Sequence, residues 1–242
     1  MSDSKIFKKA TVIIMVFGGL QKLTLLDFPG VVACTLFTRG CNFLCPFCHN
    51  ATLVNRLSEA ETISDTEVLS YLKKRIGILE GVCITGGEPL LHAELKDFIR
   101  EVKALGYKVK LDTNGSKPKY LKELVSEGLI DYVAMDIKNC FEKYPQTAGV
   151  NNLDLSDIEE SIDFLMEGGI PYEFRTTVAN GLHTVEDIEK IAKKIAGADR
   201  YFIQNFLDSG NIIGAGLSPI GQDTIEKMCK VSKNYVKDCS NR

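Results

Sequence analysis

Residues 82–112 read VCITGGEPLLHAELKDFIREVKALGYKVKLD, and this stretch decides the fold. The short apolar run at 82–85 predicts a strand, and a second such run follows at 107–112. Between them, residues 91–105 have the pattern of a helix that Gly106 stops. A strand, a helix and a second strand in this order form the unit from which parallel sheets are built.

The same alternation continues outward from this unit. Further strands are predicted at 31–37, 132–137, 172–178 and 201–205. Helices are predicted from a capping box at 64–67 with an apolar stripe to Ile76, at 120–127, from a capping box at 156–159, after Thr184 and from Ser218-Pro219. Six strand–helix units predict an α/β fold, a partial (β/α)6 barrel of parallel strands with outer helices. A flat doubly wound sheet is the alternative.

The composition is that of a globular protein, and 242 residues are enough for one domain with its own core. Residues 19–242 are predicted to form that domain, with 1–18 as an N-terminal extension or strand. The apolar run at 12–17 is too short to span a bilayer and precedes no convincing signal-peptide cleavage site. A formal net charge of −3 gives no bulk attraction to nucleic acid. We expect a cytoplasmic protein with neither a nucleic-acid nor a membrane partner.

Polar residues follow the predicted strands at their carboxyl ends, where active sites form in parallel α/β folds. They are found at 38–41, 86–89, 112–115, 136–138, 175 and 204–205. Polar residues also mark where any strand leaves the core. That accounts less well for three cysteines, a carboxylate on a Gly-Gly turn and an Asp-x-Lys at one rim.

Three of the eight cysteines, Cys41, Cys45 and Cys48, fall within eight residues, so that one loop can wrap a single inorganic centre. Thiolates favour zinc or iron–sulfur clusters. Structural zinc needs four protein ligands and would have to recruit His49 or a distant cysteine. A cubane held by three cysteines keeps one iron open for a ligand. The spacing alone leaves both centres open, and the other five cysteines form no second cluster motif.

The spacing Cys-x3-Cys-x2-Cys, with Phe47 directly before the last cysteine, resembles the motif of the radical S-adenosylmethionine (SAM) superfamily. Gly86-Gly87-Glu88-Pro89 is similar to the glycine-rich SAM-binding turn of that superfamily. The resemblance implies a [4Fe–4S] cluster on Cys41, Cys45 and Cys48, whose open iron binds the amino and carboxylate groups of SAM. It also implies reductive cleavage of SAM to methionine and a 5′-deoxyadenosyl radical that abstracts hydrogen, while the protein positions the reactants.

The resemblance gives roles to the residues of the turn. Gly86 and Gly87 are expected to let the backbone approach a ligand closely. Glu88 is expected to offer its carboxylate to the SAM amine, and Phe47 to lie beside the adenine.

Two further motifs resemble those of enzymes that activate glycyl-radical proteins. They are Asp112-Thr113-Asn114-Gly115 and Asp136-Ile137-Lys138. In the pyruvate formate-lyase type, the matching aspartates and threonine help to hold a monovalent cation against the SAM carboxylate. The match implies that Asp112, Thr113, Asp136 and Lys138 lie at the SAM and substrate end, and that Arg175 contacts SAM. An Asp–Lys ion pair with no catalytic role is the alternative.

Residues 20–30, LQKLTLLDFPG, resemble most the activating proteins of anaerobic ribonucleoside-triphosphate reductase. No cysteine occurs at 49–80, which argues against activases with a ferredoxin-like insert. The resemblance implies that the chain abstracts a hydrogen from the α-carbon of one glycine in a large glycyl-radical enzyme. It further implies an electron donor such as flavodoxin or ferredoxin.

Other functions stay open from the sequence. They are a pyruvate formate-lyase-type activating enzyme, a radical SAM enzyme that acts on a small molecule or peptide, and a zinc-binding or scaffold protein. His92 and His183 are expected at the surface or in caps and receive no role.

Overall fold

Nine strands form one sheet within residues 15–54, 61–208, 210 and 212–242, the part of the chain that the computed structural model describes. They are β1 (Val16–Thr24), β2 (Ala33–Thr38), β3 (Ile63–Ser64), β4 (Gly81–Gly86), β5 (Lys108–Thr113), β6 (Tyr132–Asp136), β7 (Tyr172–Val178), β8 (Tyr201–Asn205) and β9 (Cys239–Asn241). Their order across the sheet is β3-β1-β2-β4-β5-β6-β7-β8-β9. Every neighbouring pair from β2 to β9 is parallel, whereas β1 runs antiparallel to both β2 and β3.

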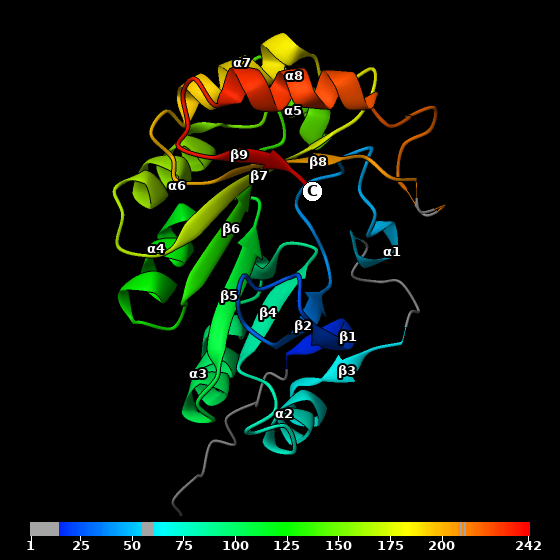
Figure 1. Cartoon of the computed structure of the whole chain (residues 1–242). Coiled ribbons are helices and arrows are strands. Elements are labelled where there is room, and N and C mark those ends of the chain that lie inside the picture. The colour runs from blue at the N-terminus through cyan, green and yellow to red at the C-terminus, as the bar shows by residue number, and fades with distance from the viewer. Residues whose placement is uncertain (1–14, 55–60, 209, 211) are drawn as a thin grey trace, which may run out of the picture.

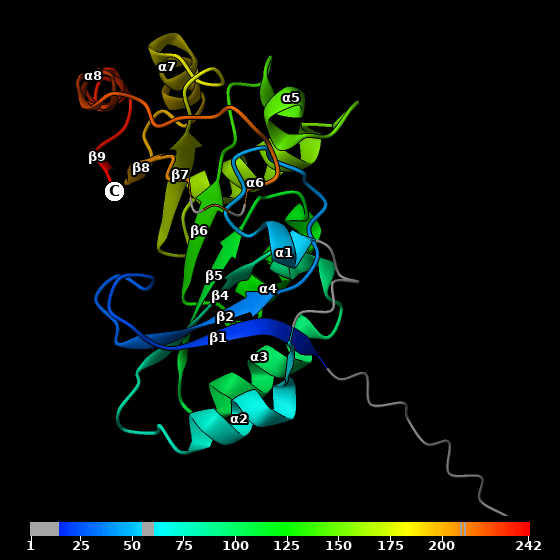
Figure 2. The ribbon, with the colours of Figure 1, turned by 90° about the vertical axis from the view of Figure 1, so that its right-hand side faces the viewer.

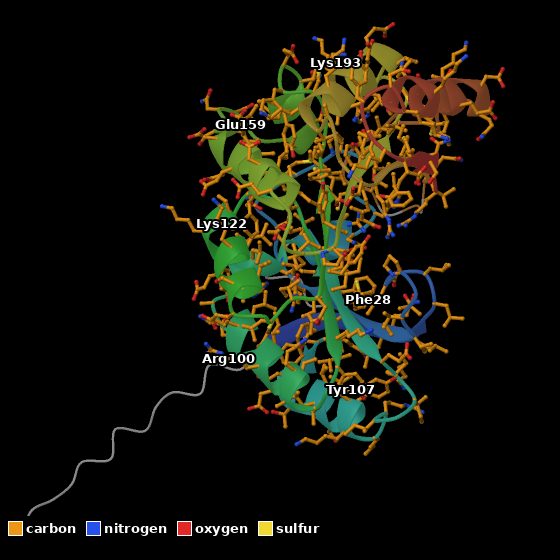
Figure 3. The ribbon with its side chains drawn as sticks, turned by 60° about the vertical axis from the view of Figure 1, so that its left-hand side comes forward. Phe28, Arg100, Tyr107, Lys122, Glu159 and Lys193 are labelled. Atoms are coloured by element: carbon orange, nitrogen blue, oxygen red, sulfur yellow. The ribbon has the colours of Figure 1, made fainter. Side chains whose placement is uncertain are left out.

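Helices fill most of the connections between the parallel strands. The described helices are α1 (Ala51–Val54), α2 (Asp65–Lys73), the 3₁₀ turn η1 (Pro89–Leu91), α3 (Leu95–Ala104), α4 (Pro118–Ser126), α5 (Tyr144–Ala148), α6 (Ser156–Met166), α7 (Val185–Lys194) and α8 (Gln222–Ser232). The longer ones turn an apolar face to the sheet and a charged face outward. Figure 3 shows four of the outward side chains, Arg100, Lys122, Glu159 and Lys193.

The sheet is curved, and this curvature gives the molecule its shape. In Figure 1 it bends from β1 at the lower right through β5 to β8 at the top, and α3, α4, α6, α7 and α8 follow its outer side. Figure 2 shows the loop after β1 and the C-terminus together on the side away from α4 and α6. The predicted partial barrel of parallel strands is confirmed, and its six predicted strands are β2 and β4 to β8.

Two of the predicted helix starts are confirmed by their caps. Ser64 and Glu67 form a reciprocal capping box at α2, and Thr184 with Asp187 forms another at α7. The apolar stripe of α2 ends earlier than predicted, because the helix stops at Lys73 and leaves Ile76 57% exposed.

Two predicted helix starts and one predicted cap are wrong. Helix α6 begins at Ser156 as predicted, but the Asp154 carboxylate accepts the Ser156 N–H, and no capping box forms. Before α8, the Asn205 side chain bonds both backbone groups of Ile220, so the helix begins only at Gln222. After β4, Glu88 caps the turn η1, and the helix predicted from residue 91 begins at Leu95.

Strand β1 spans the expected N-terminal boundary. It runs across residues 18 and 19 and pairs with β2 along most of its length. The leading residues 1–14 lie outside the described part of the chain. In the described part, no helix is long and apolar enough to cross a bilayer.

The concave side of the sheet carries polar side chains. Residues two apart on a strand share a face, so Glu173, Arg175 and Thr177 of β7 all point to this side. Glu173 is completely buried, accepts two hydrogen bonds from Arg242 at 3.0 and 3.3 Å and one from the Tyr132 hydroxyl at 3.0 Å. We call Tyr132, Glu173 and Arg242 the base cluster.

Candidate active site at the carboxyl ends of the strands

One cavity opens where the parallel strands end. The structure describes every predicted site residue and places all of them except Glu88 at this cavity: Cys41, Cys45, Phe47, Cys48, Gly86, Gly87, Asp112, Thr113, Asp136, Lys138 and Arg175. They come from β4, β5, β6, β7 and the loop between β2 and α1. The cavity therefore lies at the end of the barrel where the sequence predicted it.

The cysteine loop is held by segments far away in the sequence. Leu44 N–H donates to the Ala148 carbonyl at 2.8 Å, and Gly214 N–H donates to the Pro46 carbonyl at 2.8 Å. A Cβ on Gly149 would lie 2.3 Å from the Leu44 oxygen, so only glycine fits beside the loop. The loop is thus fixed from two sides before any ligand binds.

Gly86 and Gly87 pack against the chain itself. A Cβ on Gly86 would come within 2.5 Å of the Thr38 nitrogen, and one on Gly87 within 2.0 Å of the Gly40 oxygen. Gly87 N–H donates to Thr38 at 3.0 Å. The two glycines therefore let the chain approach the backbone that leads into Cys41. Both also line the cavity, where a close approach to a ligand is expected.

Glu88 does not have the expected orientation. Its side chain is 1% exposed and accepts hydrogen bonds from Leu90 N–H at 3.0 Å, the Thr113 hydroxyl at 2.8 Å and Asn114 N–H at 2.7 Å. Burial raises the pKa of its carboxyl to about 7, although these donors oppose the rise. The carboxylate therefore ties the Gly-Gly turn to the end of β5 instead of facing a ligand amine.

The three thiols surround the cavity without converging on a point. Burial raises the pKa of Cys41 to about 11 and that of Cys45 to about 12, and Lys138 opposes both rises. Within the described residues, no three His, Cys, Asp or Glu side chains are grouped closely enough for one metal ion. Thiols that reach a cavity from three positions along one loop fit a multi-iron cluster, whose positive irons would favour the thiolate forms.

Two groups already donate toward the Cys41 sulfur. Phe43 N–H lies 3.4 Å from it, and the Asn114 amide nitrogen lies 4.0 Å from it. The same amide nitrogen donates to Asn42 at 2.9 Å, which fixes its orientation. Such donors stabilise a thiolate ligand.

A buried ionic network forms one wall of the cavity. Arg175 bridges two carboxylates, with Nη1 3.0 Å from Asp112 Oδ2 and Nε 2.8 Å from Asp136 Oδ1. Lys138 Nζ lies 3.0 Å from Asp136 Oδ2, and Lys110 pairs with Asp112. We call these five residues the rim network. Lys110 is buried behind the wall and lies over the Tyr132 ring, whereas the other four residues line the cavity. Arg175 and Lys138 thus offer cations to an anionic ligand group.

The neighbours of the rim network set its protonation. Burial opposes ionisation of Asp112 and Asp136, but Arg175 and the lysines outweigh it and hold both pKa values below the ordinary range. Burial likewise opposes the charge of Lys138, and Asp136 outweighs it and raises the lysine pKa. Arg175, Lys138 and the two aspartates are therefore charged at neutral pH.

His183 is buried, not at the surface as expected. It accepts the Ala179 N–H on Nδ1 at 3.2 Å, so its Nε2 carries the proton and donates to the Lys138 carbonyl at 2.8 Å. Its ring meets Phe47 edge-on, with centroids 6.0 Å apart. The histidine thus supports two cavity residues from behind.

Sequence reasoning gave no role to several cavity residues. They are Phe43, His49, Asn50, Val54, Thr85, Asn114, Thr177 and Gln204. Asn114 and Gln204 carried a usable signal, since both stand at carboxyl ends of predicted strands. His49 stacks on Phe206, with ring centroids 5.6 Å apart, and nothing local to the sequence indicates that contact.

The fold and the site together define a class of protein with a cavity at the mouth of a partial parallel barrel, lined by three cysteines of one loop. The sequence model of the radical SAM superfamily matches residues 35–195, and the chain belongs to this superfamily. Membership makes the protein a radical SAM enzyme and implies a [4Fe–4S] cluster and SAM as cofactors.

Two relatives from Methanocaldococcus jannaschii match nearly end to end. Both are provisionally named glycyl-radical enzyme activating enzymes. One is 30% identical over 90% of this chain and 92% of its own length, and the other is 27% identical over 93% and 86%. The GTP 3′,8-cyclase of Helicobacter pylori is 35% identical, but over only 63% of this chain and 48% of its own.

Solved structures support the same fold. SuiB of Streptococcus suis bound to S-adenosylmethionine has a TM-score of 0.67 at 14% identity, over 85% of this chain and 48% of that one. Coproporphyrinogen III oxidase of Escherichia coli has a TM-score of 0.58 at 13% identity, over 80% and 49%. The chain spans about half the length of these structures, which share its barrel.

Proposed function

We propose that this enzyme generates a glycyl radical on a large partner enzyme, and that the partner is anaerobic ribonucleoside-triphosphate reductase. The observation that carries the proposal is the match to an activating enzyme over 90% of this chain and 92% of the relative. Residues 20–30 and the absence of cysteine at 49–80 support the choice of partner. A pyruvate formate-lyase is the alternative partner for the same reaction.

Cys41, Cys45 and Cys48 would hold the cluster in this proposal. When bound, the reduced cluster and SAM supply the radical that removes the glycine hydrogen. The chain contributes a loop that is fixed at Leu44 and Pro46, and donors from Phe43 and Asn114 that stabilise the Cys41 thiolate.

The rim network would bind the methionine part of SAM. Arg175 and Lys138 offer positive charge to its carboxylate, and Asp112, Thr113 and Asp136 would share a monovalent cation with it. The cation would have to compete with Arg175, which already bridges both aspartates. We therefore expect the cation to add only modestly to SAM affinity.

The other predicted residues would hold the rest of SAM. The backbone of Gly86 and Gly87 would receive the amino group, and Phe47 would lie beside the adenine. Glu88 would affect SAM binding indirectly, because its carboxylate positions Thr113 and the Gly-Gly turn.

The unclosed side of the barrel would admit the partner. Among the described strands, β3 and β9 stand at the two edges of the sheet and do not pair with each other. A glycine loop that enters there reaches the cavity without passing through the helical layer (Figure 1). Flavodoxin or ferredoxin would supply the electron.

The proposal is tested by mixing the reduced, cluster-loaded enzyme with SAM and the purified reductase under anaerobic conditions. We expect the doublet of a glycyl radical by electron paramagnetic resonance and one 5′-deoxyadenosine per radical. A reductase in which the radical glycine is replaced by alanine is the matched control. SAM cleavage without a doublet, on either the reductase or pyruvate formate-lyase, would refute the activase proposal and leave the superfamily assignment intact.

Small-molecule chemistry is the second candidate. The observation in its favour is the 35% identity to a GTP cyclase over 63% of this chain. Incubation of the loaded enzyme with SAM and GTP would give a cyclised nucleotide if this candidate is right.

A further inference from the structure

Two cysteines that the proposed function does not use lie on adjoining elements. Cys229 lies on α8, and Cys239 begins β9, which packs against that helix. Both line a surface cavity together with Lys230 and Lys233, and this cavity shares no lining residue with the active-site cavity. Cys229 is half-buried and can be reached from this cavity, whereas the Cys239 side chain is completely buried.

The backbone holds the two sulfurs in place. After α8 the chain turns through Tyr235 and Val236, whose N–H groups donate to the Ser232 carbonyl at 2.9 and 3.0 Å. Tyr201 N–H then donates to the Asp238 carbonyl at 3.0 Å and aligns β9 with β8. Cysteines that are held on adjoining elements and line the same cavity can be bridged with small movements.

The other cysteines outside the triad have neighbours of different kinds. Cys83 lies 3.8 Å from Asp112 and 3.9 Å from Lys110, and Cys140 lies 3.4 Å from Asp187. Cys34 is completely buried in the main core. In the part of the chain that the structure describes, these three serve as internal controls for the pair.

We propose that Cys229 and Cys239 are a dithiol site that reacts with a low-molecular-weight disulfide and thereby forms a disulfide between α8 and β9. Cys229, the more exposed of the two, attacks as a thiolate, breaks the S–S bond and releases one thiol. Cys239 then loses its proton, attacks the Cys229 sulfur and releases the second thiol. Two protein thiols are oxidised, and the external disulfide is reduced to two thiols that take up the two protons.

The residues around the two thiols determine the rate of this thiol–disulfide exchange. Burial raises the pKa of both thiols, to about 12 for Cys239, while Lys233 opposes the rise at both and Glu226 adds to it at Cys229. The thiolate that attacks is therefore scarce at neutral pH, and mildly alkaline solution accelerates the exchange.

The new bond would fasten the end of the chain. Strand β9 is held by β8 on one side only, and the residue that follows it, Arg242, completes the base cluster. A disulfide to α8 adds a covalent link at the other side of Cys239.

The test uses the full-length, cluster-loaded protein, so that the triad stays ligated. The protein is incubated anaerobically with oxidised glutathione at mildly alkaline pH, then denatured, alkylated and digested with trypsin. Cleavage at the lysines yields peptides 228–230 and 238–242. We expect these two peptides linked in mass spectra, separated again by dithiothreitol, while Cys34, Cys83 and Cys140 are recovered alkylated.

The matched variant is Cys229→Ser, which we expect to abolish the linked peptide. Recovery of Cys229 and Cys239 as separate alkylated or separately glutathionylated residues in the unmodified protein would overturn the proposal. Because the unmodified protein decides the outcome, a variant that fails to fold does not affect the test.

Discussion

The rim network and the base cluster stand on the same strands, yet they differ in what they face. Glu173 and Arg175 are two residues apart on β7 and point to the same side of the sheet. Glu173 is sealed between Arg242 and Tyr132, while Arg175 lines the cavity. The charged groups of the base cluster find their partners within the protein. Those of the rim network face the cavity, where a ligand can bind.

The comparison shows how one polar face serves two purposes. Buried charges need partners wherever they lie. At the base, Glu173 and its partners are closed off from the cavity, whereas at the rim four charged side chains line it: Asp112, Asp136, Lys138 and Arg175. Contact with the cavity, and not burial itself, distinguishes the layer that is suited to binding.

The largest effect is expected from Cys45→Ser at the rim. Loss of a thiolate ligand should leave a folded barrel that binds little iron and cleaves no SAM above background. Iron content, 5′-deoxyadenosine formation and circular dichroism measure the three parts of this prediction. The matched control is Cys34→Ser, far below the rim on β2, which should keep the cluster. Full iron content in Cys45→Ser would contradict the ligand assignment.

The second effect separates the two layers directly. Arg175→Gln removes the bridge between Asp112 and Asp136, and we expect SAM to bind about 10–100-fold more weakly, as for a lost hydrogen bond to a charged group. Breaking a buried pair should also lower the free energy of unfolding by about 3–5 kcal/mol. Calorimetric titration with SAM and urea unfolding measure the two.

Glu173→Gln is the matched variant in the base cluster. It should cost about 1–3 kcal/mol of stability, because Arg242 loses its charged partner, and it should leave SAM affinity unchanged. If both variants weaken SAM equally, the distinction between the layers is wrong. Arg175→Lys, which keeps the charge, should fall between wild type and Arg175→Gln.

The third effect concerns Glu88, behind the rim. Its folded-state pKa of about 7 lies above the ordinary value of 4.5, so its contribution to stability is complete below pH 4.5 and is lost as pH rises through 7. The loss amounts to about 3 kcal/mol for a shift of this size. Glu88→Gln should flatten this part of the pH profile in the cluster-free protein.

Burial also lowers the pKa of His49 and of His183, so both add to the pH dependence of stability. The measurement is therefore the difference between the unfolding free energies of wild type and Glu88→Gln at each pH. A difference that stays constant from pH 4.5 to 7.5 would mean that the three donors keep Glu88 ionised throughout.

The smallest effect is that of the monovalent cation. Since Arg175 already bridges the two aspartates, replacing potassium by choline should weaken SAM binding only about threefold, which corresponds to less than 1 kcal/mol. In Arg175→Gln, the SAM affinity should depend more strongly on the cation, because Arg175 no longer competes with the cation for the two aspartates. An equal dependence in both proteins would show that the cation does not use this site.

Much of the barrel could be predicted because its determinants are local. Strands β7 and β8 match their predicted limits, since each follows a predicted helix and consists mostly of aromatic and β-branched residues. Thr184 and Ser64 cap helices through residues three positions away. By contrast, β9 depends on its pairing with β8, and the start of α8 depends on the hydrogen bond from Asn205 to Ile220. No local sequence pattern reveals either contact.

The site divides in the same way. Residue type and position at strand ends predicted which side chains would meet at the cavity. They could not predict the direction of the Glu88 carboxylate, because that depends on donors from Thr113 and Asn114 on another strand. The support of the cysteine loop by Gly149 and Gly214 is likewise a matter of contact across the fold.

That support has a consequence for biosynthesis. The cysteines leave the ribosome early, but the backbone groups that fix their loop belong to residues 148 and 214. A nascent chain therefore carries its three thiols unprotected until most of the barrel has been made. Insertion of a cluster into the fixed pocket would therefore follow the synthesis of residues 148 and 214.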